Sequence, residues 1–174
     1  MFVSKSYIKF PNMNVYDLSD VERRPFSYFI EIDNTEEILR IKNNLDLNYI
    51  YGVIYLTYNK QVIMGFTYYD LVDQLWAYFL NMIEDFLETQ KSEMSFPDQP
   101  LPMSMHKISD AYILFSINFI QWKLPKYEFF NTLLIGAKDF FEKMVLILEE
   151  KNKSYQFQLR RIKQLEQKID TLKK

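Results

Sequence analysis

The apolar spacing in the C-terminal part of the chain constrains the fold more than any other feature. Large apolar side chains recur there at alternating intervals of three and four residues: Phe141, Met144, Leu148, Tyr155, Ile162, Leu165, Ile169 and Leu172. This is the heptad spacing of a helix with one apolar stripe, and a single straight helix cannot bury such a stripe by itself. The pattern predicts a long amphipathic helix that another surface must cover.

Two heptad positions in the middle of this stripe are polar, Lys151 and Gln158. Such a break favours a helix whose first part packs into a domain spanning residues 1–150 and whose extension, 151–174, meets a second chain. The residues predicted to form this self-association seam are Tyr155, Ile162, Leu165, Ile169 and Leu172. The alternative is an extension that folds back on its own sheet.

Upstream of the stripe, apolar periodicity alternates between the strand and helix patterns. The predicted strands are 7–10, 26–32, a hairpin of 49–58 with 61–68, and a second hairpin within 103–122 that turns near Ser109 and Asp110. The predicted helices are 35–44, 70–88 and one that starts at Pro125 and runs into the heptads. This order predicts an α+β fold, a mostly antiparallel sheet of two hairpins plus N-terminal strands, packed by helices.

Two local signals support these elements. Asn34 followed three residues later by Glu37 is a capping box that opens the first predicted helix. Asn59 and Lys60 separate the strands of the first hairpin by the length of a tight two-residue turn.

The composition excludes several classes of protein. The chain contains no Cys, which excludes a disulfide scaffold, a thiol nucleophile and thiolate zinc sites. The first residues lack the apolar core of a signal peptide, and no apolar run reaches the roughly 18 residues of a membrane span. We therefore expect a cytoplasmic protein with no membrane contact.

Charge is segregated along the chain although the formal net charge is only -2. Residues 70–98 hold seven acidic residues and one basic residue, whereas 151–174 hold eight basic residues and two acidic residues. Asp73, Glu84 and Glu88 lie on one side of the 70–88 helix at helical spacing. These carboxylates are predicted to attract a basic protein partner.

The candidate catalytic groups are few. His106 is the only histidine and is interpreted as structural. Carboxylates on one side of the 70–88 helix could hold Mg²⁺, which leaves a carboxylate-dependent hydrolase as a third hypothesis, but no opposing ligand set is visible. We therefore predict no catalytic residues, no metal and no cofactor. Arg160, Arg161 and Lys163 are interleaved with apolar and acidic residues, so nucleic-acid binding is not expected.

Large rings supply the remaining candidates. Trp76 lies on the apolar face of the 70–88 helix and is predicted to be in the core. Trp122 can either close the core or stand at an interface. The segment FPDQPLP is either a connector or a recognition loop that exposes Phe96 and Asp98. The predicted partner-binding residues are thus Asp73, Glu84, Glu88, Phe96, Asp98 and Trp122.

Three segments, YDLVDQLWAYFLNMIEDF, FPDQPLP and the helix after LPKYEFF, resemble small cytosolic bacterial immunity proteins that accompany polymorphic toxins. The resemblance implies a non-catalytic protein that neutralises a basic toxin by presenting carboxylates. The leading hypothesis is therefore a non-enzymatic binding protein of this kind. The alternative is a structural or regulatory protein that dimerises through its C-terminal helix.

Overall fold

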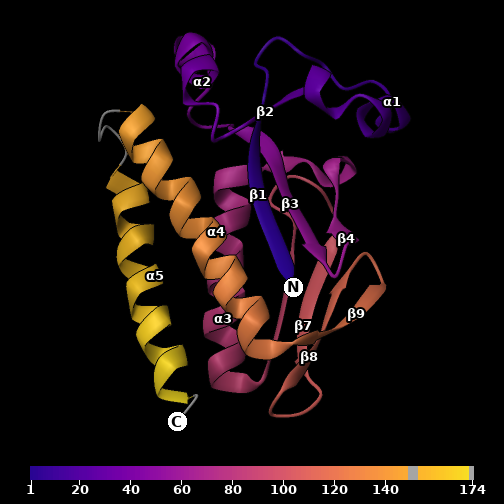
Figure 1. Cartoon of the computed structure of the whole chain (residues 1–174), viewed down its shortest axis with the longest axis vertical. Helices are drawn as coiled ribbons and strands as arrows, with labels where there is room; N and C mark the ends of the chain where they lie inside the picture. The colour runs from indigo at the N-terminus through magenta and orange to yellow at the C-terminus, as the bar shows by residue number, and fades with distance from the viewer. Residues whose placement is uncertain (149–152, 173–174) are drawn as a thin grey trace.

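The computed structural model describes residues 1–148 and 153–172. Within these residues the chain has the predicted α+β class, with α-helices α1 to α5 and two antiparallel sheets (Figure 1). The expectation of one sheet is wrong, because the described strands form two sheets that do not pair with each other.

The first sheet has the strand order β2-β1-β3-β4, with the short β5 also paired to β3. Its strands are β1 (Phe2–Lys9), β2 (Phe29–Glu31), β3 (Tyr51–Tyr58), β4 (Gln61–Met64) and β5 (Asp70–Leu71). The β3–β4 hairpin is the one predicted, and its turn residues Asn59 and Lys60 have φ values of 48° and 69°. Two consecutive positive φ values are those of the type I′ turn that matches strand twist.

The second sheet is an antiparallel meander, β6-β7-β8-β9. Its strands are β6 (Lys91–Ser95), β7 (Pro102–Lys107), β8 (Tyr112–Ile117) and β9 (Ile120–Pro125). The turn between β7 and β8 falls at residues 108–111, as predicted. The sequence interpretation missed the next turn, Asn118 and Phe119, whose φ values of 46° and 69° close a second tight hairpin without any glycine.

The helices divide into two groups. The short α1 (Leu18–Arg23) and α2 (Thr35–Ile41) lie at one end of the first sheet, together with the 3-10 turns η1 (Pro25–Ser27) and η2 (Lys42–Asn44) (Figure 1). A third turn, η3 (Phe66–Tyr68), follows β4. The long helices α3 (Val72–Thr89), α4 (Lys126–Ile147) and α5 (Lys153–Leu172) form a layer, in which α3 contacts strands of both sheets and α4 contacts β1 and β9.

Several boundaries differ from the prediction. The segment expected as a strand at 26–32 begins as η1, because Pro25 fixes the start of a 3-10 turn, and only Phe29–Glu31 pairs with β1. Strand β6 was not predicted, and the last residue of the FPDQPLP segment, Pro102, is the first residue of β7. Asn34 caps α2, because its Oδ1 accepts from the backbone N–H of Glu37 at 3.3 Å. The capping box is only half formed, since the Glu37 carboxylate accepts from the Asn34 side-chain amide at 2.8 Å, and the Asn34 backbone N–H donates to the Glu31 carbonyl.

The core is built from rings and aliphatic side chains of both sheets and the long helices. Trp76 is fully buried, as predicted, and its Nε1 donates to Ser6 Oγ at 3.0 Å. Gly136 lets α4 approach this site closely, because a Cβ there would lie 2.6 Å from Trp76 Cη2 and 2.7 Å from Ser4 Oγ. Any larger residue at that position would push α4 away from β1.

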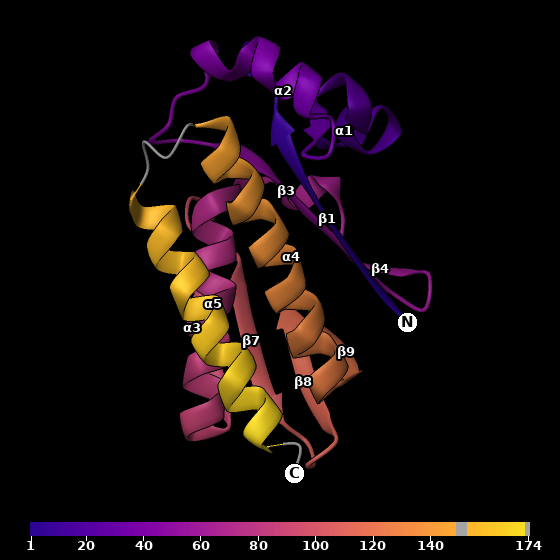
Figure 2. The ribbon, with the colours of Figure 1, turned by 60° about the vertical axis from the view of Figure 1, so that its left-hand side comes forward.

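The predicted single long C-terminal helix is two helices. Helix α4 ends at Ile147, and α5 runs back beside it and beside α3 (Figure 2). The break position Lys151 lies outside the described residues. Four of the residues predicted to form a self-association seam are at most 2% exposed and belong to the chain's own core: Tyr155, Ile162, Leu165 and Ile169.

That seam prediction is therefore wrong for these four side chains, because helices α3 and α4 already cover them. The fifth predicted residue, Leu172, is 56% exposed. The extension does fold back, as the alternative held, but the described part of it packs mainly on helices α3 and α4.

Candidate functional site

The acidic side of α3 faces the basic α5, so much of the charge that the sequence separates is brought together. Arg161 donates to Glu84 at 2.9 Å and to Asn81 at 2.8 Å. The Lys168 ammonium lies 3.5 Å from the same glutamate. Tyr155 donates its hydroxyl hydrogen to Asp73 at 2.9 Å. These contacts orient α5 on α3.

The two α3 carboxylates at this interface have opposite electrostatics. Hydrogen bonding and proximity to Arg161 hold the pKa of Glu84 below its ordinary value. Burial raises the pKa of Asp73, although the hydrogen bond from Tyr155 opposes that effect. The same burial, with the nearby Asp73 charge, raises the pKa of Tyr155. One contact is thus a charge pair and the other a desolvated hydrogen bond.

The predicted partner-binding set is divided by this arrangement. Asp73 and Glu84 make contacts within the chain, to Tyr155 and Arg161, whereas the prediction treated them as carboxylates offered to a partner. Glu88, near the end of α3, is exposed, as is Asp98.

A buried carboxylate holds the proline-rich segment in place. Asp70, the first residue of the predicted 70–88 helix, lies in β5 and is fully buried. It accepts backbone N–H bonds from Leu71 at 2.6 Å, Asp98 at 3.0 Å and Gln99 at 3.1 Å. Burial raises its pKa despite these three bonds. The carboxylate therefore fixes the FPDQPLP segment to the first sheet.

This attachment turns the segment inward. Phe96 is 3% exposed, which contradicts its predicted role as an exposed anchor, and its ring packs 6.1 Å from that of Tyr68. Asp98 accepts from the Tyr51 hydroxyl at 2.6 Å, and this bond raises the pKa of Tyr51 to about 12. The segment thus acts as a connector with one exposed carboxylate.

The candidate catalytic groups are not brought together. The imidazole of His106 lies 3.5 Å from Glu93 on the open face of the second sheet, and both side chains are exposed. Among the described residues, no three His, Asp or Glu side chains gather in a way that could hold a metal ion.

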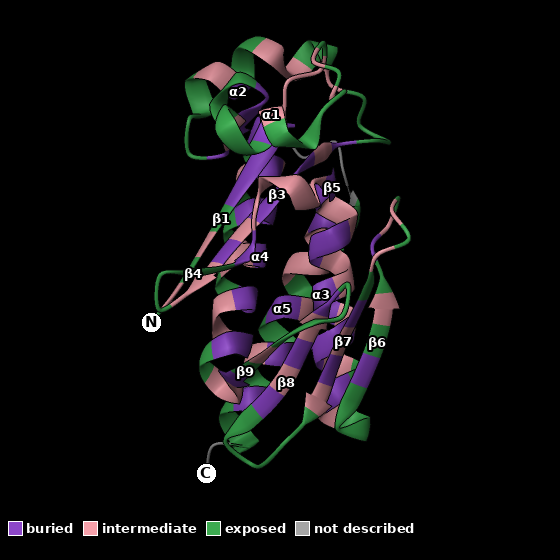
Figure 3. Cartoon of the chain, turned by 90° about the vertical axis from the view of Figure 1, so that its right-hand side faces the viewer, coloured by how far each residue is buried: buried purple, intermediate pink, exposed green. Residues whose placement is uncertain are grey.

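A cleft of about 470 Å³ lies between the two sheets. Its floor and walls come from η3, β3, β4 and β9, and the end of α1 with η1 completes the rim. Figure 3 shows β4 of the first sheet and β9 of the second sheet on the side of the molecule that faces the viewer. The lining is mostly apolar and aromatic: Tyr55, Val62, Ile63, Phe66, Tyr68, Ile120 and Trp122, with Glu22, Pro25, Gly65 and Thr67. Of the predicted binding residues, Trp122 lies here, half-buried against the core.

Several apolar side chains at this cleft remain in contact with solvent. Val62 is 46% exposed and Ile120 is 53% exposed. Phe26, beside the rim, is 68% exposed, and its ring lies 5.9 Å from that of Phe66. Exposed apolar side chains gathered around a concave surface are typical of binding sites, whereas single ones are common anywhere on a protein.

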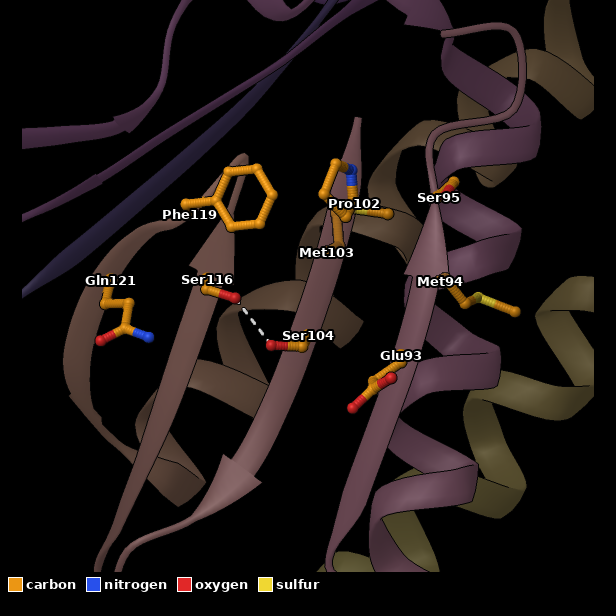
Figure 4. A pocket seen from close by; sticks show the side chains of 9 residues that line it. All are labelled: Glu93, Met94, Ser95, Pro102, Met103, Ser104, Ser116, Phe119 and Gln121. Atoms are coloured by element: carbon orange, nitrogen blue, oxygen red, sulfur yellow. Dashed lines mark hydrogen bonds between the residues drawn. The ribbon is translucent and has the colours of Figure 1, made fainter. Parts of the chain in front are cut away.

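A second hollow, of about 650 Å³, lies on the outer face of the second sheet (Figure 4). Its lining is mostly polar, with Ser104 and Ser116 hydrogen-bonded at 2.7 Å across β7 and β8. Gln121 of β9 and the 86% exposed Phe119 lie at its edge. Strand β9 therefore has an apolar hollow on one face and a polar hollow on the other.

The cleft was not predicted, although one signal for it is in the sequence. Val62 follows the predicted turn of the first hairpin by one residue, where a solvated face would carry a polar side chain. Ile120 is also an apolar residue close to a hairpin turn, since it directly follows Asn118 and Phe119, but that turn was not recognised. Which strand ends meet depends on how the two sheets are placed, and this is not encoded locally.

Comparison of the chain with protein-family models, with curated proteins and with solved structures finds no match. No helix in the described part of the chain has a stretch apolar and long enough to cross a membrane.

Proposed function

We propose that this chain is a non-enzymatic binding protein that holds a partner protein in the cleft between its two sheets. The observation that carries the proposal is the exposure of two apolar side chains that line the cleft, Val62 and Ile120, together with the half-buried Trp122. A tryptophan ring surrounded by exposed aliphatic side chains is typical of the residues that contribute most of the binding energy at protein interfaces. Glu88 and Asp98 remain exposed and can attract a basic partner.

The more specific form of the proposal is an immunity protein that neutralises a basic toxin. Its support is the resemblance of the α3, FPDQPLP and α4 segments to such proteins, together with the exposed cleft. Dimerisation through α5 has less support, because four of its five seam residues are covered within the chain.

Site-specific photo-cross-linking in cells that make the protein tests the binding role. The photoreactive residue p-benzoylphenylalanine replaces Ile120 at the cleft or, as a matched control of similar exposure, Phe157 on α5. We expect a discrete protein adduct from position 120 that Val62→Asp removes, and none from position 157. No adduct at position 120, or equal adducts at both, would contradict the proposal.

The captured protein then tests the immunity form. Produced alone, it should arrest growth, and co-production of this chain should restore growth. Co-production of the Val62→Asp variant, folded to the same extent by circular dichroism, should fail to restore it. A captured protein without toxicity would reject the immunity role and leave the binding role intact.

A further inference from the structure

We propose that the cleft binds its partner by strand addition: an extended apolar segment of the partner pairs through its backbone with the free edge of β9. This inference rests on the proposed function and specifies how the partner is held. It is carried by the hydrogen-bonding state of β9, by the different chemistry of its two faces and by the charge at the cleft rim.

The first observation is that β9 has an unpaired edge. Among the described residues it pairs only with β8. The two-residue turn at Asn118 and Phe119 makes Ile117 and Ile120 a hydrogen-bonded pair, and such pairs alternate along an antiparallel ladder. The backbone groups of Gln121 and Lys123 therefore point away from β8. An edge of this kind is a ready template for another strand.

The second observation is the alternation of side chains along the same strand. Ile120 and Trp122 line the apolar cleft, whereas Gln121 lines the polar hollow with Ser116 (Figure 4). A strand added beside β9 would continue this alternation, since neighbouring residues point to opposite faces. The occupant is therefore an extended segment with apolar side chains on alternate positions and small polar ones between them.

The third observation concerns the protection that edge strands normally carry. Across the cleft, β4 has the sequence QVIM, with no charged residue and with Val62 46% exposed. The one lysine of β9, Lys123, is drawn to the other face, where its ammonium lies 4.6 Å from the centre of the Tyr112 ring. Neither β4 nor β9 therefore presents on the cleft side the charged side chains that usually prevent an exposed edge strand from pairing with another strand.

Charge and width favour a segment of another protein over a second copy of this chain. Glu22 is exposed at the cleft rim and is the charged side chain of its lining, so the fitting segment carries a basic residue beside its apolar positions. A second copy would have to bring its own β9 together with the walls of its own cleft. An extended segment needs only the width of one strand, about 5 Å.

The test begins with selection of displayed random decapeptides on the full chain. We expect enriched peptides with apolar residues on alternate positions and a basic residue at one end. The affinity of one such peptide is then measured on Gln121→Pro, which removes an outward N–H and is tolerated at an edge strand. Gln121→Thr is the matched control because it keeps the N–H. Affinity should fall at least tenfold for the proline variant and less than twofold for the threonine variant.

A second arm tests the backbone pairing from the side of the peptide. Two peptides are compared, one N-methylated at the odd-numbered residues and one at the even-numbered residues. Only one edge of the peptide faces β9, so one of these sets should abolish binding and the other should leave it nearly unchanged. Sedimentation of the peptide complex should give one copy of the chain. A peptide-free dimer that Gln121→Pro dissociates would instead assign the edge to a second copy and overturn the proposal.

Failure of this inference is distinguishable from failure of the proposed function. Peptides that bind Gln121→Pro as tightly as the parent, or no enriched peptides at all, would overturn strand addition. The cross-link from position 120 would still report a partner in the cleft. Loss of that cross-link would remove the binding function itself.

Discussion

The α3–α5 interface and the β4–β9 cleft are both rich in apolar side chains, but the chain covers only one of them. On α3, the apolar face is flanked by carboxylates, and α5 supplies the matching Arg161, Lys168 and Tyr155. At the cleft, the apolar side chains are flanked by unpaired strand edge, and of the described α-helices only α1 reaches the lining, through Glu22. This difference indicates that the polar groups beside an apolar surface, more than its apolar content, show whether another part of the same chain covers it.

The largest expected effect is removal of one side of the closed surface. Ending the chain at Asn152 deletes α5 and exposes the apolar faces of α3 and α4 that it covers. We expect loss of the cooperative thermal transition, since burial of apolar area is the main stabilising term in folding. Differential scanning calorimetry measures this. A truncated chain that melts like the full one would show that α5 is dispensable.

Replacing each tryptophan by alanine compares the contribution of the closed core with that of the open cleft to the free energy of unfolding. Trp76→Ala should reduce the free energy of unfolding by about 3 to 5 kcal/mol, because the ring is fully buried and its loss leaves a cavity. Trp122→Ala should reduce it by less than half as much, since that ring is half-buried. Urea titrations followed by circular dichroism give both values. Equal losses would mean that the cleft belongs to the core.

Replacing one isoleucine on each surface by alanine makes the same comparison with the removal of fewer atoms. Ile162→Ala on α5 should destabilise by about 2 to 4 kcal/mol, because its side chain is fully buried. Ile120→Ala at the cleft should change the free energy of unfolding by less than about 0.5 kcal/mol. A large cost at Ile120 in the absence of a partner would place that side chain inside the protein.

The pH dependence of the α3–α5 interface is expected to be the smallest effect. Glu84 has a lowered folded pKa, so its contribution is present above its unfolded pKa and is lost as pH falls through the folded value. Glu84→Gln should therefore cost at most about 1 kcal/mol at neutral pH and nothing in acid, given its partial exposure. Thermal melts from neutral pH to about pH 3 measure this loss.

Asp73 should behave with the opposite sign. Its raised folded pKa means that the ionised form is penalised by folding at neutral pH, and that the penalty disappears as pH falls below the unfolded pKa. Asp73→Asn should therefore match or exceed the parent in stability at neutral pH and lose this advantage in acid. Parallel pH profiles for the two variants would indicate that Asp73 is not desolvated.

Local patterns in the sequence predicted most of the elements. The helix cap at Asn34 and the hairpin turn at Asn59 and Lys60 were predicted because their signals lie within a few residues. The Asn118–Phe119 turn was missed because it lacks glycine and its flanking apolar strands merge into one run. The division into two sheets depends on long-range pairing that periodicity does not report.

The site was predicted less well, for the same physical reason. Segregated charge on α3 and α5 was detected, but a charge pattern does not say whether its complement lies in another protein or in the same chain. The exposure of Phe96 was wrongly predicted because Asp70, distant in sequence, accepts backbone N–H bonds from the FPDQPLP segment and holds it against the first sheet. Trp122 was retained as a candidate, and its neighbours across the cleft were not found.

Native-state hydrogen exchange of the full chain tests the central claim most directly, namely that α5 is part of the core and not a seam for another molecule. Amides of α5 around Ile162 and Ile169 should open with the same free energy as those of α3 around Trp76, at every protein concentration. Exchange of α5 at a lower free energy, with protection that rises with concentration, would show that a second molecule covers the stripe and would contradict the account.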